Sequence, residues 1–127
     1  MEQRKIVAVT AFGILACLPW AAFADGQEEC RQDLQCWAEK HHISAEIKCE
    51  RPIERLARFS TRWTDRFLER RFSVYAWHDK ATGAISYFGD MVEFQTPGGA
   101  WQPIIYKCDF DPETDTVIGV VGEPGRL

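Results

Sequence analysis

The chain of 127 residues lacks the short motifs that mark common catalytic sites. It contains no Gly-x-Ser-x-Gly nucleophile elbow, no His-Glu-x-x-His metal motif and no phosphate-binding loop. Positive charge is also scarce, because 15 basic residues face 19 acidic ones and leave a formal charge of −4. That balance argues against nucleic-acid binding driven by gross positive charge. We therefore expect a protein that is not an enzyme, carries no cofactor and binds no nucleic acid.

Cys-x-x-Cys pairs are absent as well, although the chain has five cysteines. Structural zinc sites are commonly built from such closely spaced pairs, so we expect no metal site. Internal repeats, low-complexity tracts and Ser/Gly-rich linkers are missing too. With 46% hydrophobic and 27% charged residues, the composition is that of one globular domain.

Residues 1–24 have the order of a secretory signal peptide. A positive start at Arg4 and Lys5 precedes an apolar run over 6–18, and a small-residue Ala-Phe-Ala pattern ends at Ala24. This order predicts cleavage after Ala24.

The expected product is a single domain over 25–127, located in the periplasm or secreted. The apolar run before it is shorter than the roughly 20 residues that span a bilayer, so we expect membrane contact only at the surface. Lipidation at Cys17 is the alternative that the sequence leaves open. Cleavage removes Cys17 and leaves Cys30, Cys36, Cys49 and Cys108, an even number that predicts two disulfides in an exported chain.

Two short helices are expected at the start of this domain. Residues 33–40 suit the first helix, 41–44 read as a turn, and Ser44 is the expected N-cap of the second. The second helix has an apolar stripe at steps of four, four and three, made of Ala45, Cys49, Ile53 and Leu56.

This helical pair suggests a disulfide pairing. If the chain folds back between His42 and Ile43, Cys36 lies opposite Cys49 in the hairpin. The pairing Cys36–Cys49 then leaves Cys30 to join Cys108. The other pairings stay open, because sequence alone does not determine connectivity.

After Trp63 the hydrophobic period falls to two, which predicts β-strands. The expected strands are 72–78, 85–88, 91–94, 104–110 and 116–121, with an irregular edge strand within 61–69. Gly89-Asp90 fits a type II′ hairpin turn between two of these strands. The prediction is an α+β fold, in which an N-terminal helical hairpin packs on a four- or five-stranded antiparallel meander.

A series of motifs runs through the whole expected domain. They are Cys-x5-Cys-Trp at 30–37, Trp-Thr-Asp at 63–65, Tyr-Phe-Gly-Asp at 87–90, Gly-Ala-Trp at 99–101 and Tyr-Lys-Cys-Asp-Phe-Asp at 106–111. Their order resembles a family of small, uncharacterised, exported bacterial proteins with cysteines at these positions. Longer relatives carry the same module after a zinc ribbon, and this sequence contains no such ribbon. Relatives usually read Gln-Asn-Gly-Phe-Gly where this chain reads Gln-Thr-Pro-Gly-Gly, so no role of that loop carries over.

Two groups of residues are candidates for binding. Arg51, Arg55 and Arg58 recur at helical spacing, which suits a solvated helix face or a docking surface for anionic lipid, cell-wall polymer or an acidic protein. Gln95, Trp101 and Tyr106 are the candidate lining of a groove, with core packing as the alternative.

Two further patterns are weak evidence for a functional site. His78-Asp79 is a poor base and carboxylate pair, because neighbours on a strand point to opposite sides. The alternating acids of 109–115 fail as a calcium loop, because Thr114 and Val120 replace the required glycine and acid.

Because no catalytic motif stands out, we expect a binding domain that acts on a protein or cell-envelope partner. The family resemblance implies an accessory role in plasmid conjugation or type IV secretion as one alternative. Inhibition of a cell-wall hydrolase is the other.

Overall fold

The computed structural model describes Gly26 and residues 28–127. These residues divide into a unit that ends at Asp33 and a larger compact unit over Leu34–Leu127. The predicted signal peptide and Cys17 lie outside the described residues. Within residues 28–127, no helix has the length and apolar character needed to cross a membrane.

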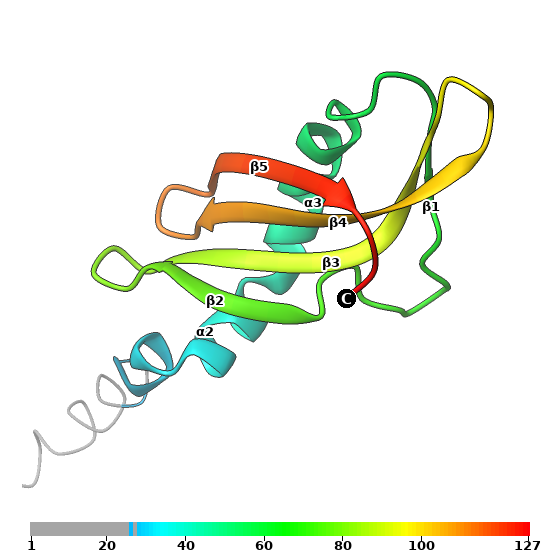
Figure 1. Ribbon diagram of the computed structural model, residues 1–127. Coiled ribbons are helices and arrows are strands. Elements are labelled where there is room, and N and C mark those ends of the chain that lie inside the picture. The colour runs from blue at the N-terminus through cyan, green and yellow to red at the C-terminus, as the bar shows by residue number, and fades with distance from the viewer. Residues whose placement is uncertain (1–25, 27) are drawn as a thin grey trace, which may run out of the picture. The chain divides into compact units, whose positions relative to one another are not determined.

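The larger unit is built on a five-stranded antiparallel sheet (Figure 1). Its strands are β1 (Thr61–Trp63), β2 (Val74–Asp79), β3 (Ala84–Gln95), β4 (Trp101–Asp111) and β5 (Thr116–Pro124). β3 pairs with β4 on one side, and its other side is shared by β2 and β1. β5 pairs with the outer side of β4. The predicted α+β class and antiparallel sheet are confirmed.

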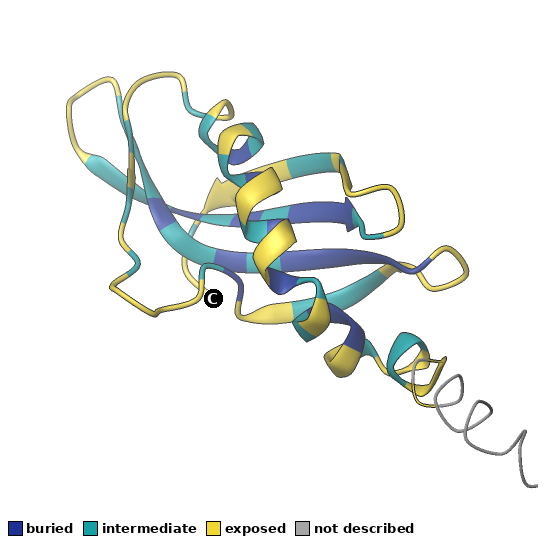
Figure 2. Cartoon of the chain, turned by 180° about the vertical axis from the view of Figure 1, so that it is seen from behind, coloured by how far each residue is buried: buried dark blue, intermediate teal, exposed yellow. Residues whose placement is uncertain are grey.

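Two helices, α2 (Leu34–Lys40) and α3 (His42–Glu54), lie across one face of this sheet, as Figure 2 shows. Only His41 separates them. Its backbone N–H donates to Trp37 O at 3.3 Å, and Ala45 N donates to His41 O at 3.0 Å, so helical bonding continues through the junction. The predicted turn at 41–44 with Ser44 as the N-cap is therefore wrong, because the chain continues into α3 without folding back.

The core lies between the helices and the sheet face that they cover. Ala45, Cys49 and Ile53 of α3 are at most 1% exposed, which confirms most of the predicted apolar stripe. The fourth member, Leu56, lies past the end of α3 and is 38% exposed. The sheet supplies its own fully buried side chains to this core, chiefly Ile85, Tyr87, Val92, Tyr106, Cys108 and Phe110.

A disulfide crosses this core from α3 to β4. Cys49 is bonded to Cys108, and their Cα atoms are 6.2 Å apart. Cys30 and Cys36 are each disulfide-bonded as well, so all four predicted cysteines are oxidised. The predicted pairing of Cys36 with Cys49 and Cys30 with Cys108 is wrong, because it depended on the helical hairpin. Cys49 instead lies on the face of α3 that packs on the sheet.

The predicted hairpin turn at Gly89-Asp90 is also wrong, because β3 continues through these residues. The register with β4 shifts between Gly89 and Val92, so this stretch of β3 has one residue more than β4. Such a bulge bends the strand without ending it. Gly89 is required by close packing, since a Cβ there would lie 1.9 Å from Arg71 O and 2.6 Å from the Tyr106 hydroxyl.

We predict that Gly89→Ala destabilises the fold by about 3 kcal/mol, the upper end of the cost of overpacking. The methyl group would have to displace backbone as well as a buried ring. Gly119→Ala is the matched control on β5, because nothing lies within 4 Å of its would-be Cβ. It should change the free energy of unfolding by less than about 0.5 kcal/mol. Urea denaturation of both variants tests this, and equal effects would contradict the packing role of Gly89.

Candidate functional site

The structure brings two of the predicted binding residues together. Gln95 ends β3 and Trp101 begins β4, and they are register partners on the sheet face that the helices leave uncovered. The Gln95 side chain donates from Nε2 to Gly99 O at 3.3 Å, within the turn that joins the two strands.

Tyr106 does not belong with this pair. Side chains alternate between the two faces of a strand, so Trp101 and Tyr106 point in opposite directions. Tyr106 is fully buried under the helices, with its ring centroid 5.6 Å from that of Trp63 and 5.8 Å from that of Phe72. Burial raises the pKa of its hydroxyl. The predicted groove of Gln95, Trp101 and Tyr106 is therefore wrong, and Tyr106 is a core residue.

The Trp101 ring is partly covered by a cation. The Arg62 guanidinium carbon lies 4.3 Å from the ring centroid, a cation–π geometry. Arg62 Nε also lies 2.6 Å from Glu93 Oε1, and Arg126 approaches the same carboxylate at 3.6 Å. The positive charge of Arg62 is thus matched within the fold.

Arg51, Arg55 and Arg58 differ from Arg62 in this respect. All three are exposed, and among residues 28–127 they form no ion pair. Arg51 and Arg55 are one helical turn apart at the end of α3, where Arg55 N donates to Arg51 O at 3.0 Å. Phe59, which is 51% exposed, follows directly after Arg58. We call Arg51, Arg55, Arg58 and Phe59 the arginine patch.

The arginine patch and the Gln95–Trp101 pair lie at the same end of the sheet. In Figure 1 the connection from α3 to β1 runs beside the turn that joins β3 to β4. Gln95 N donates to Ser60 O at 2.9 Å, which fixes the two segments together. The two predicted groups thus converge on one end of the molecule, apart from Tyr106.

A second exposed feature was not predicted from the sequence. Phe67 is 93% exposed and Leu68 is 87% exposed, in the connection between β1 and β2. Leu68 has φ +68°, a left-handed conformation that is strained for leucine. Glu69 N donates to Arg66 O at 2.9 Å, and the Glu69 carboxylate accepts from Arg66 N at 2.9 Å, so the turn is closed twice. We call Phe67 and Leu68 the apolar tip.

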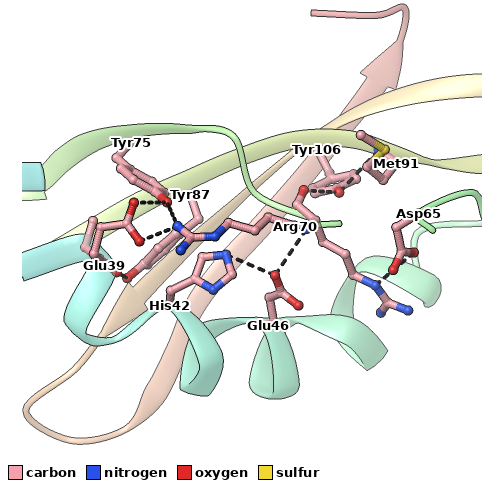
Figure 3. Close-up of polar contacts among 11 residues, drawn as sticks. Glu39, His42, Glu46, Asp65, Arg70, Tyr75, Tyr87, Met91 and Tyr106 are labelled. Atoms are coloured by element: carbon pink, nitrogen blue, oxygen red, sulfur yellow. Dashed lines mark hydrogen bonds and ion pairs between the residues drawn. The ribbon is translucent and has the colours of Figure 1, made fainter. Parts of the chain in front are cut away.

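The base of this connection is tied to the helices and the sheet (Figure 3). The Arg70 guanidinium pairs with Glu39 of α2 and lowers the pKa of that carboxyl. Arg71 N donates to Glu46 Oε2 of α3 at 3.1 Å, and the Arg71 guanidinium lies 3.2 Å from Asp65. The Tyr106 hydroxyl donates to Arg71 O. The apolar tip therefore projects from a fixed base.

His42 lies beneath this network and is only 7% exposed. Its Nε2 atom is 3.0 Å from Glu46 Oε2, and its ring centroid is 6.4 Å from that of Phe72. Burial lowers the pKa of His42, while the Glu46 carboxylate opposes this shift. The His42 imidazole therefore packs from the first residue of α3 against the core.

The sheet face away from the helices carries a polar cluster. Asp109 is 8% exposed and accepts a hydrogen bond from Ser86 Oγ at 2.5 Å. His78 Nδ1 and Lys107 Nζ each lie 3.5 Å from the other Asp109 oxygen. The structure thus pairs His78 with Asp109 across the sheet and not with Asp79, its neighbour in sequence. Beside this cluster is a hollow of about 210 Å³ lined by Phe88, Ile105, Tyr106, Lys107, Val121, Gly122 and Glu123.

Within residues 28–127, no three His, Cys, Asp or Glu side chains are grouped so that they could hold a metal ion. No protein-family model, curated protein or solved structure matches the chain. Functional assignment therefore depends on the surfaces described above.

We predict that Leu68→Gly stabilises the fold by about 1 kcal/mol, because glycine adopts a positive φ without the steric cost that leucine bears. Little packing is lost, since the leucine side chain is almost fully exposed. Phe67→Ser is the control in the same turn, and its effect should stay within about 0.5 kcal/mol. Thermal unfolding measures both, and destabilisation by Leu68→Gly would contradict the claim that backbone strain at Leu68 is the dominant effect.

We also predict that the free energy of unfolding falls as the pH drops from about 7 to about 5. The pKa of His42 is lowered from 6.5 in the fold, so the unfolded chain binds this proton more readily and acid favours unfolding. His41, whose pKa burial also lowers, adds to the effect. His42→Gln should flatten the slope measured by urea denaturation, and an unchanged slope would contradict this origin.

Proposed function

We propose that this chain is an exported, non-enzymatic binding domain that engages an anionic partner in the cell envelope through the arginine patch. The partner class is an acidic protein, a cell-wall polymer or a lipid surface. Binding by this patch requires no cofactor or metal ion.

The observation that carries the proposal is the absence of ion pairs at Arg51, Arg55 and Arg58 in the described part of the chain. Four other arginines lie near a carboxylate, namely Arg62, Arg70, Arg71 and Arg126. Exposed Arg66, beside Phe67, forms no ion pair within residues 28–127 either, but it stands alone in the connection between β1 and β2. The chain as a whole has more acidic than basic residues, so carboxylates are not in short supply. Three unmatched arginines between positions 51 and 58 of such a chain provide complementary charge for an anionic partner.

An effect on the helix itself is the competing explanation. Cations near a helix C-terminus stabilise it by about 0.3–1 kcal/mol each through the helix dipole. Arg51 and Arg55 are placed to do this, because α3 ends at Glu54. Arg58 lies three residues beyond the C-cap residue Arg55, and Phe59 contributes nothing to the dipole. The helix dipole therefore accounts for part of the arginine patch only.

The disulfide bonds support the exported location that the proposal requires. Disulfide bonds persist in oxidising, extracytoplasmic compartments and are rare in the reducing cytosol. All four cysteines beyond the predicted cleavage site are in disulfide linkage. These bonds are consistent with a protein that is exported to the periplasm or secreted after its signal peptide is cleaved.

We predict that exchanging Arg51, Arg55 and Arg58 for Glu together weakens retention in the envelope fraction at least about tenfold, since each cation near an anionic surface contributes about 1 kcal/mol. The matched control is Lys48→Glu, on the same helix, because Lys48 already lies 3.4 Å from Asp115. Fractionation of the expressed chain at low and high salt measures retention. Retention that is unchanged both by high salt and by the arginine substitutions would contradict the proposal.

Inhibition of a cell-wall hydrolase is a second candidate, favoured by the apolar tip. A rigid projecting turn with an aromatic side chain is preorganised to enter the cleft of a partner enzyme at low entropic cost. The expected result is that the wild-type protein suppresses lysozyme-type cleavage of cell walls at equimolar dose, and that Phe67→Ser abolishes suppression. Full cleavage in the presence of the wild type would exclude this candidate.

A further inference from the structure

The arginine patch combines charge with exposed apolar surface. Between Arg55 and Phe59 the sequence reads Arg-Leu-Ala-Arg-Phe. Phe59 is 51% exposed and Leu56 is 38% exposed, so exposed apolar residues are interspersed in sequence with the unmatched arginines. An acidic partner alone would explain the arginines but not the exposed phenylalanine.

We propose that the arginine patch docks on the surface of an anionic lipid bilayer, with the guanidinium groups at the lipid phosphates and Phe59 in the interface. This inference rests on the proposed function and names its partner. Guanidinium groups donate two parallel hydrogen bonds to a phosphate, and aromatic rings favour the headgroup boundary. Arginine beside phenylalanine therefore matches both layers of a bilayer interface.

The patch is held in a fixed position on the fold. The Cys49–Cys108 bond joins α3 to the sheet two residues before Arg51. Ile53 is buried, and Glu54 Oε2 accepts a hydrogen bond from Trp63 Nε1 at 2.8 Å. Beyond the arginines, Ser60 O accepts a hydrogen bond from Gln95 N. Attachments on both sides fix the segment, so little conformational entropy is lost when the patch binds.

A bilayer fits the patch better than an acidic protein does. A protein partner would need a pocket for Phe59 and carboxylates at three separate arginines. An anionic bilayer accepts an apolar side chain anywhere along its interface and presents phosphates at high density. Its attraction for cations also falls off within a Debye length, so binding should weaken with salt.

The test is co-sedimentation of the protein, recovered from the periplasmic or secreted fraction, with two kinds of vesicle. One kind contains phosphatidylglycerol and phosphatidylcholine, and the other contains phosphatidylcholine alone. We expect binding to the first and little to the second. Each arginine should contribute about fivefold, so changing Arg51, Arg55 and Arg58 to Glu should weaken binding by roughly a hundredfold.

Three control variants separate the effects of charge and of apolar insertion from unfolding. Changing the three arginines to Lys keeps the charge and should keep most of the binding, whereas Lys48→Glu should change it little. Phe59→Ser should weaken binding several-fold, whereas Phe67→Ser, at a more exposed phenylalanine, should not. Thermal unfolding of each variant shows that the fold is intact.

Equal binding to both kinds of vesicle, or loss of binding with Phe67→Ser but not with Phe59→Ser, would overturn the inference. No binding to anionic vesicles would overturn it as well. If envelope retention still depends on Arg51, Arg55 and Arg58 in that case, the partner is an acidic protein or polymer, and the proposed function stands. If retention is independent of these arginines, both proposals fail.

Discussion

The bond between Cys49 and Cys108 is the constraint on which the placement of α3 depends. Taken alone, α3 is a weak helix, because His41 provides no side-chain cap and Pro52 removes a backbone donor near its end. Ile43 and Ile47 are also exposed, at 73% and 67%. The disulfide closes a loop over a sequence separation of 59, for which chain entropy predicts about 4 kcal/mol of stabilisation. A helix with these weaknesses keeps its position because it is bonded to the sheet.

Buried hydroxyl and indole groups add direction to this attachment. Tyr87 on β3 donates to Ala38 O of α2 at 2.8 Å, and Trp37 Nε1 donates to Gly83 O at 2.9 Å. Tyr106 on β4 donates to Arg71 O, beside the apolar tip. Each bond satisfies a polar group that would be costly to bury alone, and so each fixes one position of the neighbouring segment. The exposed surfaces are therefore presented by a framework that is specified from inside.

The sequence predicted the parts of the fold that follow from local pattern. The period-two alternation identified most of the strands, and the stripe at Ala45, Cys49 and Ile53 identified the buried face of α3. Prediction from local pattern failed where one residue type is compatible with two different structures. Gly89 suits a tight turn as well as a close contact, and only the presence of Arg71 O and the Tyr106 ring beside it decides between them. The cysteine pairing failed in turn, because it was built on a helical turn that does not form.

The candidate site was predicted only in part, because local spacing is visible in the sequence and contacts between distant segments are not. Helical spacing indicated Arg51, Arg55 and Arg58, but their lack of ion pairs depends on where the carboxylates of distant segments lie. Tyr106 was misplaced because alternation along β4 separates it from Trp101 by five positions, which puts the two on opposite faces. Phe67 and Leu68 gave no signal, because their exposure results from how Arg70 and Arg71 are anchored.

Disulfide mapping by mass spectrometry, on protein taken from its native compartment without reduction, tests whether α3 is bonded to the sheet. We expect one cross-linked peptide that joins Cys49 to Cys108, and no free thiol at either residue. A peptide that joins Cys36 to Cys49, or free thiols at Cys49 and Cys108, would contradict this expectation.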